Sequence, residues 1–262
     1  MFMGFKQKYP EYEVITPQTN QSFRLRSLTV QEEERMKGSL ISPSSVTDHL
    51  NRCIWDCIVV KPENIKTFED FLTSCTMKDR DAILYGLYHV TYEEVRNYDV
   101  SCGSCRKNHA VTLRISESFS MDPFPDDRKI LTETHNVKLP ILDGVFVTIR
   151  QPTLQDERDI MKLSGNNSKM LDVLTETLII KSITENSEGE DSNIYSSRED
   201  IVDAYRAMPP KDKRAIFNEY REKMGKYGIQ LNTRVNCPHC GEEDVIDLDL
   251  VDNFFRMVHT ID

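Results

Sequence analysis

The sequence of 262 residues has no apolar run that approaches the roughly 20 residues a membrane-spanning helix needs. Its first residues, MFMGFKQKYPEYE, lack the apolar stretch of a secretory signal peptide. The chain also contains seven cysteines, an odd number. Cysteines in a chain without a secretory signal indicate a reducing compartment. We therefore expect a protein that neither spans a membrane nor enters an oxidising compartment.

Clustered positive charge is also missing. The chain has 33 Lys and Arg against 43 Asp and Glu, a net charge of -10, and its isoelectric point is about 5.2. The basic residues are dispersed, so no stripe of them could follow a phosphate backbone. The acidic balance argues against nucleic acid as the main partner.

Catalytic motifs are absent from the sequence as well. It contains no Ser/His/Asp set, no glycine-rich phosphate loop and no two-histidine metal motif. The histidines show no common spacing. We therefore expect a non-enzymatic protein without a small-molecule substrate.

Two Cys-x-x-Cys motifs lie 135 residues apart, Cys102-Gly-Ser-Cys105 and Cys237-Pro-His-Cys240. The same offset aligns alternating apolar residues, so each copy predicts a strand, a turn and a second strand. One such motif supplies half of a tetrahedral zinc shell, and two supply four thiolates with no open position. The pattern predicts one structural zinc ion bound by Cys102, Cys105, Cys237 and Cys240. Redox dithiols, unrelated thiols and a site shared between two chains are the alternatives.

The similarity between the two parts of the chain extends upstream of the cysteines. An offset of 124 aligns Arg26 with Arg150, Thr29 with Thr153, Gln31 with Gln155 and Glu33 with Glu157; an offset of 133 aligns Asp79 with Asp212, Ala82 with Ala215 and Ile83 with Ile216. The change of offset requires nine extra residues, and the acidic, serine-rich segment 184–200 is a natural place for them. This pattern indicates an internal duplication. The alternative is a likeness of two helical segments by composition.

We predict an α+β fold in which a mainly helical module is duplicated and each copy ends in a Cys-x-x-Cys hairpin of the zinc-ribbon type. Each module begins with a strand and a helix that starts at a capping box, Thr29 to Glu32 in the first and Thr153 to Asp156 in the second. The predicted boundaries are an N-terminal tail at 1–16, the first module at 17–119, a linker at 120–136 and the second module at 137–262, with 184–200 as a flexible acidic insertion.

Three segments of the chain carry a resemblance to a known family. They are LTVQEEE at 28–34, DRDAILYGL at 79–87 and YDVSCGSC at 98–105. Together they resemble the baseplate hub subunits of T-even-like contractile-tailed bacteriophages. In the second half, NTRVNCPHC at 232–240 keeps the cysteines and lacks the tyrosine. The resemblance implies a structural or assembly component of the tail baseplate hub, made in the host cytoplasm, located in the virion tail and bound to other tail or baseplate proteins.

Other functions are compatible with the same residues. A transient tail-assembly chaperone would leave before the particle matures. A zinc-ribbon adaptor would bind the transcription or translation machinery. An enzyme of another type is a further alternative.

Overall fold

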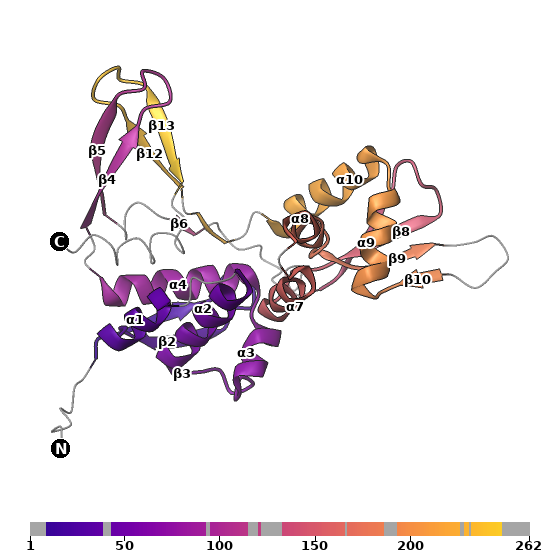
Figure 1. Ribbon diagram of the computed structural model, residues 1–262, viewed down its shortest axis with the longest axis horizontal. Coiled ribbons are helices and arrows are strands. Elements are labelled where there is room, and N and C mark those ends of the chain that lie inside the picture. Colours follow the sequence, from indigo (N-terminus) through magenta and orange to yellow (C-terminus); the bar gives the residue numbers. More distant parts are fainter. Residues whose placement is uncertain are drawn as a thin grey trace.

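The computed structural model describes residues 9–38, 43–92, 95–114, 120–121, 133–165, 167–185, 193–225, 228–230 and 232–247. Helices and strands are mixed throughout these ranges. Figure 1 shows two compact units of helices and strands beside each other, and a pair of hairpins that projects from the first unit. We call residues 9–114 the first half and residues 133–247 the second half.

The first half folds into a three-stranded antiparallel sheet, order β1-β2-β3, packed against helices. Its elements are β1 (Glu11–Ile15), β2 (Ser22–Arg26), α1 (Val30–Gly38), α2 (Pro43–Cys57), β3 (Ile58–Val60), α3 (Phe68–Ser74), α4 (Met77–Thr91), β4 (Val95–Ser101) and β5 (Asn108–Arg114). The core forms where the apolar face of β2 meets α2 and α4, around Phe23, Leu25 and Ile54, all without exposed surface. The strands β4 and β5 form the first hairpin.

The second half repeats the order of these elements, with a strand (β10), a π-helical turn (η1) and a two-residue strand added. Its elements are β7 (His135–Lys138), β8 (Val145–Ile149), α7 (Leu154–Ser164), α8 (Ser168–Glu176), β9 (Ile180–Glu185), β10 (Asn193–Tyr195), α9 (Arg198–Ala207), α10 (Pro210–Tyr220), the π-helical turn η1 (Arg221–Gly225), β12 (Asn232–Asn236) and β13 (Glu243–Asp247). The sheet order is β10-β9-β8-β7, and Val147, Ile149 and Ile216 lie in its core. Strands β12 and β13 form the second hairpin. The strand β6 (Ser120–Met121), which lies between the halves in the sequence, pairs with β11 (Ile229–Gln230) of the second half.

An arginine and an acidic residue join the second strand to the following helix in each half. Arg26 donates from Nη2 to Glu32 Oε1 at 2.5 Å, and Arg150 donates from Nη2 to Asp156 Oδ1 at 2.6 Å. Both carboxylates also accept a hydrogen bond at 2.8 Å from the backbone N–H of a threonine three residues earlier. These contacts confirm the predicted capping at both helix starts.

In each half, a buried aspartate in the first turn of a helix accepts hydrogen bonds from the turn between the first two strands. Asp79, in the first turn of α4, accepts hydrogen bonds from the backbone N–H of Gln18 and from the hydroxyl of Thr19 in the β1–β2 turn. Asp212, in the first turn of α10, accepts from the backbone N–H of Ile141 and of Leu142 in the β7–β8 turn. Both aspartates are fully buried. Burial, the largest influence, raises the pKa of Asp79 above its ordinary value although the hydrogen bonds oppose it.

The two halves meet where α7 packs against α2, α3 and α4. Leu154, at the start of α7, is fully buried in the first-half core, and its N–H donates to Cys75 O at 3.1 Å. The N–H of Met77 donates to Pro152 O at 3.2 Å in return. Arg80 and Glu157 form a buried ion pair across the same contact.

The structure corrects three of the predicted boundaries. The tail prediction was wrong for Glu11–Ile15, since these residues pair with β2; residues 1–8 lie outside the described part. Of the predicted linker, Ser120–Met121 and His135 belong to strands, and 122–132 lie outside the described part. Of the predicted insertion 184–200, the described residues form the paired ends of β9 and β10 and the start of α9.

Tight packing against a glycine explains why β1 forms. A Cβ built at Gly86 on α4 would overlap Cγ2 of Val14. The missing side chain lets β1 lie directly on the helix, and Val14 becomes buried. Because the apolar residues of β1 alternate with glutamates, its composition resembles that of a polar tail.

Candidate metal centre

The two Cys-x-x-Cys motifs fold into the same turn. In the first hairpin the N–H of Cys102 donates to Lys107 O, and Cys102 O accepts from the N–H of Arg106. In the second, the N–H of Cys237 donates to Glu242 O, and Cys237 O accepts from the N–H of Gly241. Two equivalent residues have positive φ, 58° at Arg106 and 77° at Gly241. Each turn thereby directs its two cysteines to one side.

All four predicted ligands come together at the tips of the hairpins, within one chain. Cys102 Sγ lies 3.8 Å from Cys240 Sγ, and Cys105 Sγ lies 3.7 Å from Cys237 Sγ. All four sulfurs lie within 4.8 Å of one another. Zinc–sulfur bonds of about 2.3 Å in a tetrahedron place sulfurs about 3.8 Å apart. The cluster therefore has the donor atoms and the size to bind a metal ion.

The arrangement has approximate twofold character. In each motif the sulfur of the first cysteine lies within 3.8 Å of the sulfur of the second cysteine of the other motif. The first cysteines, Cys102 and Cys237, are both buried, whereas Cys105 is half-buried and Cys240 is exposed. Figure 1 shows the two hairpins meeting at their tips, far from the helices of the second half.

Polar contacts fix one hairpin to the other at the cluster. The N–H of Gly103 donates to Asp244 Oδ2 at 2.8 Å. This bond, with a second from the N–H of Val245, lowers the pKa of the Asp244 carboxyl below its ordinary value. Asp244 was not singled out from the sequence. Its position seven residues after Cys237 was the available signal.

The surroundings of Cys237 favour a thiolate. Desolvation opposes ionisation, but hydrogen bonds from the backbone N–H of His239 and of Cys240 lower the pKa of Cys237 to about 6. A thiolate is the form of cysteine that binds metal. His239 itself is exposed and contacts Cys237 Sγ through its backbone.

The other three cysteines lie elsewhere. Cys53, Cys57 and Cys75 are buried in the first-half core, as expected for core residues. They therefore take no part in the cluster.

Sequence reasoning missed the contacts that join distant elements. Asp79 and Asp212 appeared only as aligned residues, and Arg80 and Glu157 were not linked at all. Nothing in the spacing of Arg80 and Glu157 identifies them as partners. Among the described residues, no helix has both the length and the apolar character of a membrane span.

One known protein family matches most of the chain. The model of the family described as T4 bacteriophage base plate protein matches residues 9–256, a range that includes both halves and all four clustered cysteines. The chain belongs to the T4 base plate protein family. Membership in this baseplate family makes it a structural component of a phage tail. No curated protein and no solved structure matches the chain.

Proposed function

We propose that this base plate family protein is a hub subunit in which one structural zinc ion fastens two diverged copies of a module to each other. Cys102, Cys105, Cys237 and Cys240 would bind the ion. The observation that carries the proposal is the convergence of four sulfurs from hairpins that are far apart in the sequence, at separations suited to zinc.

Three features of the fold support an origin by duplication. The elements follow one order in both halves. The Arg26–Glu32 pair has its counterpart at an offset of 124, and the two buried aspartates brace equivalent turns. The two cysteine turns share their hydrogen bonds and their positive-φ residue. Likeness by composition alone does not explain shared contacts.

A site with four thiolate ligands has no open position for water or substrate, so its role is structural. Structural zinc contributes on the order of 10 kcal/mol in apparent terms, comparable with the stability of a whole domain. The halves contact each other through α7 and neighbouring residues, through α4 and the chain around β11, and at the hairpins, where the N–H of Gly103 donates to Asp244; the ion would strengthen the attachment at the hairpins. Together these attachments would hold the halves as one rigid body.

The protein would act by binding other tail or baseplate proteins, without catalysis. It would be made in the host cytoplasm and retained in the virion. The family match favours this function over that of an adaptor for transcription or translation. A transient assembly chaperone is distinguished from a retained subunit by the composition of the particle.

Two measurements test the proposal. Elemental analysis of the purified protein should find one zinc per chain, and a metal-free, fully folded protein would contradict the zinc assignment. Quantitative mass spectrometry of purified phage particles should find the chain at a fixed stoichiometry. Its absence from particles, with its presence in assembly intermediates, would show a chaperone instead.

A further inference from the structure

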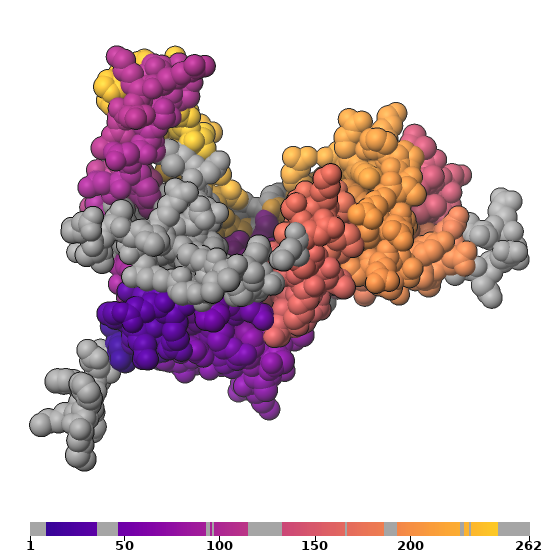
Figure 2. Space-filling model, viewed as in Figure 1, coloured from indigo at the N-terminus to yellow at the C-terminus, as the bar shows by residue number. Residues whose placement is uncertain are grey.

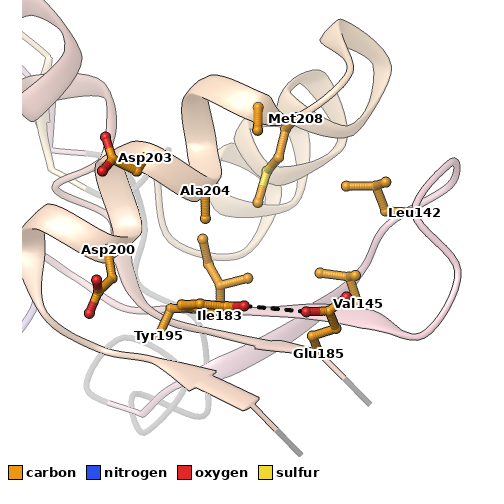
Figure 3. Close-up of a pocket in the computed structure, with 10 residues that line it drawn as sticks. Leu142, Val145, Ile183, Glu185, Tyr195, Asp200, Asp203, Ala204 and Met208 are labelled. Atoms are coloured by element: carbon orange, nitrogen blue, oxygen red, sulfur yellow. Dashed lines mark hydrogen bonds between the residues drawn. The ribbon is translucent and has the colours of Figure 1, made fainter. Parts of the chain in front are cut away.

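A cavity opens in the second half at a place where the two halves differ. It has a volume of about 360 Å³ and lies between α9, the β7–β8 turn and the β9–β10 hairpin (Figure 3). By the offset of 133, Ala204 on α9 corresponds to Phe71 on α3. Phe71 is fully buried against Trp55, with ring centroids 5.7 Å apart. The second half therefore has the methyl group of Ala204 where the first half has the ring of Phe71, and β10 forms an additional side of the cavity.

The floor and sides of this cavity, which we call the α9 pocket, are apolar. They consist of Leu142, Val145, Ile183, Ala204 and Met208. Ile183 and Met208 are buried within the sheet and helix layers. Asp212 holds the backbone of Leu142 in place, so the turn that forms one side is fixed. The pocket is therefore preformed.

The rim of the α9 pocket is acidic. Glu185, Asp200 and Asp203 stand around the opening with exposed side chains, and no lysine or arginine is among the described residues that line it. The hydroxyl of Tyr195 donates to Glu185 Oε2 at 3.3 Å, which the dashed line in Figure 3 marks. Ser197 Oγ donates to Asp200 Oδ2 at 2.6 Å. Three carboxylates around an apolar floor attract a cation attached to an apolar group.

We propose that the α9 pocket binds one aromatic or leucine-sized side chain of another protein, with a lysine or arginine beside it in that protein's chain. Anchors of this kind, seated in preformed pockets, supply much of the energy of protein interfaces. The volume is at the low end of the roughly 300–1,000 Å³ of ligand pockets, which suits a side chain. The assignment of the partner to the phage tail rests on the proposed function.

Short peptides test the pocket directly. The probe is an acetylated and amidated pentapeptide, Gly-Lys-Phe-Lys-Gly, titrated into protein with labelled methyl groups. We expect saturable shifts of the methyl signals of Leu142, Ile183 and Met208 at millimolar peptide. A Gly-Glu-Phe-Glu-Gly peptide should bind clearly more weakly, and a Gly-Lys-Ser-Lys-Gly peptide should leave these signals unshifted.

Variants identify the groups responsible. Ala204→Phe should fill the pocket and abolish the shifts, whereas Ala110→Phe, at an exposed site on β5, should leave them unchanged. Should Ala204→Phe fail to fold, Ala207→Phe at the exposed edge of the pocket serves the same purpose. The double variant Glu185→Gln/Asp203→Asn should weaken binding about 2- to 10-fold, the effect of two exposed ion pairs.

The double variant Glu63→Gln/Glu69→Gln makes the same change of net charge away from the pocket and should bind as wild type does. Equal binding of the lysine and glutamate peptides, or shifts that survive Ala204→Phe, would overturn the proposal. Zinc content and presence in particles are measured separately, so failure of the pocket leaves the proposed function standing. A folded, zinc-bound protein without peptide binding refutes the pocket alone.

Discussion

In the proposed zinc site each clustered cysteine supplies one of four sulfurs, so replacing one would leave an incomplete shell. We expect Cys237→Ser to lower zinc far below one per chain and to lower the melting temperature of the whole protein, because the shell joins both hairpins. Elemental analysis and thermal melting by circular dichroism measure both effects. The control is His239→Ala, an exposed residue of the same turn, which should keep zinc and stability. An unchanged melt for Cys237→Ser would contradict a shared shell.

The carboxyl of Glu32 makes the free energy of unfolding depend on pH. The hydrogen bond from Arg26, aided by Thr29, lowers the pKa of Glu32 to about 2 from an ordinary 4.5. A carboxyl with a lowered folded-state pKa stabilises the fold above its ordinary pKa, and the contribution is lost as pH falls from about 4.5 towards 2.

We expect Glu32→Gln to cost about 1.5–3 kcal/mol at neutral pH, the range for hydrogen bonds to charged groups. The difference from wild type should shrink between pH 4.5 and pH 2. Urea unfolding across this range measures it, with the exposed Glu34→Gln as control. A difference independent of pH would show that the ionised carboxylate is not responsible.

At the scale of elements, the packing of β1 on α4 depends on Gly86. Alanine would add roughly 1 kcal/mol of helix propensity, yet its Cβ would overlap Val14. We expect Gly86→Ala to be destabilising by about 1–3 kcal/mol, as overpacked cores are. Hydrogen exchange should show loss of protection in β1 first. Enhanced stability would mean that β1 contributes little to the core.

The elements that could be predicted from the sequence are those with local signals. Capping boxes place Thr29 and Thr153 at helix starts within four residues of sequence, and alternation around the cysteines gives both hairpins. β1 lacked such a signal, because Val14 is buried only through contact with distant Gly86. β10 could not be recognised from the sequence, because it lies in an acidic, serine-rich segment and forms a strand by pairing with β9.

At the scale of the whole molecule, the buried Arg80–Glu157 pair connects the halves. Removing one partner leaves the other charge buried, which costs about 3–5 kcal/mol. We expect Arg80→Met and Glu157→Met each to destabilise by this amount, and the double variant to lose less than their sum. Urea unfolding measures the cycle. Arg158→Met removes the more exposed pair with Asp48 and should cost at most about 1 kcal/mol.

The candidate metal centre could be predicted from the sequence, because two Cys-x-x-Cys motifs with the same spacing together supply four ligands for one site. The contact between the halves could not be predicted, since Arg80 and Glu157 do not align with each other at either offset of the sequence. The α9 pocket was also hidden. The pocket lies where the second half has Ala204 and the first half has the ring of Phe71. One of its sides is β10, which forms a strand only through its pairing with β9.

Pro210 lacks a hydrogen-bond donor that the first half uses to hold the second half. In the first half, Met77 offers its amide to the incoming backbone at Pro152, and the equivalent position in the second half is Pro210. Proline has no amide hydrogen to offer. If the proposed duplication holds, a segment docking at the start of α10 could not receive the backbone hydrogen bond that Met77 gives to Pro152, so a partner bound there would use other contacts.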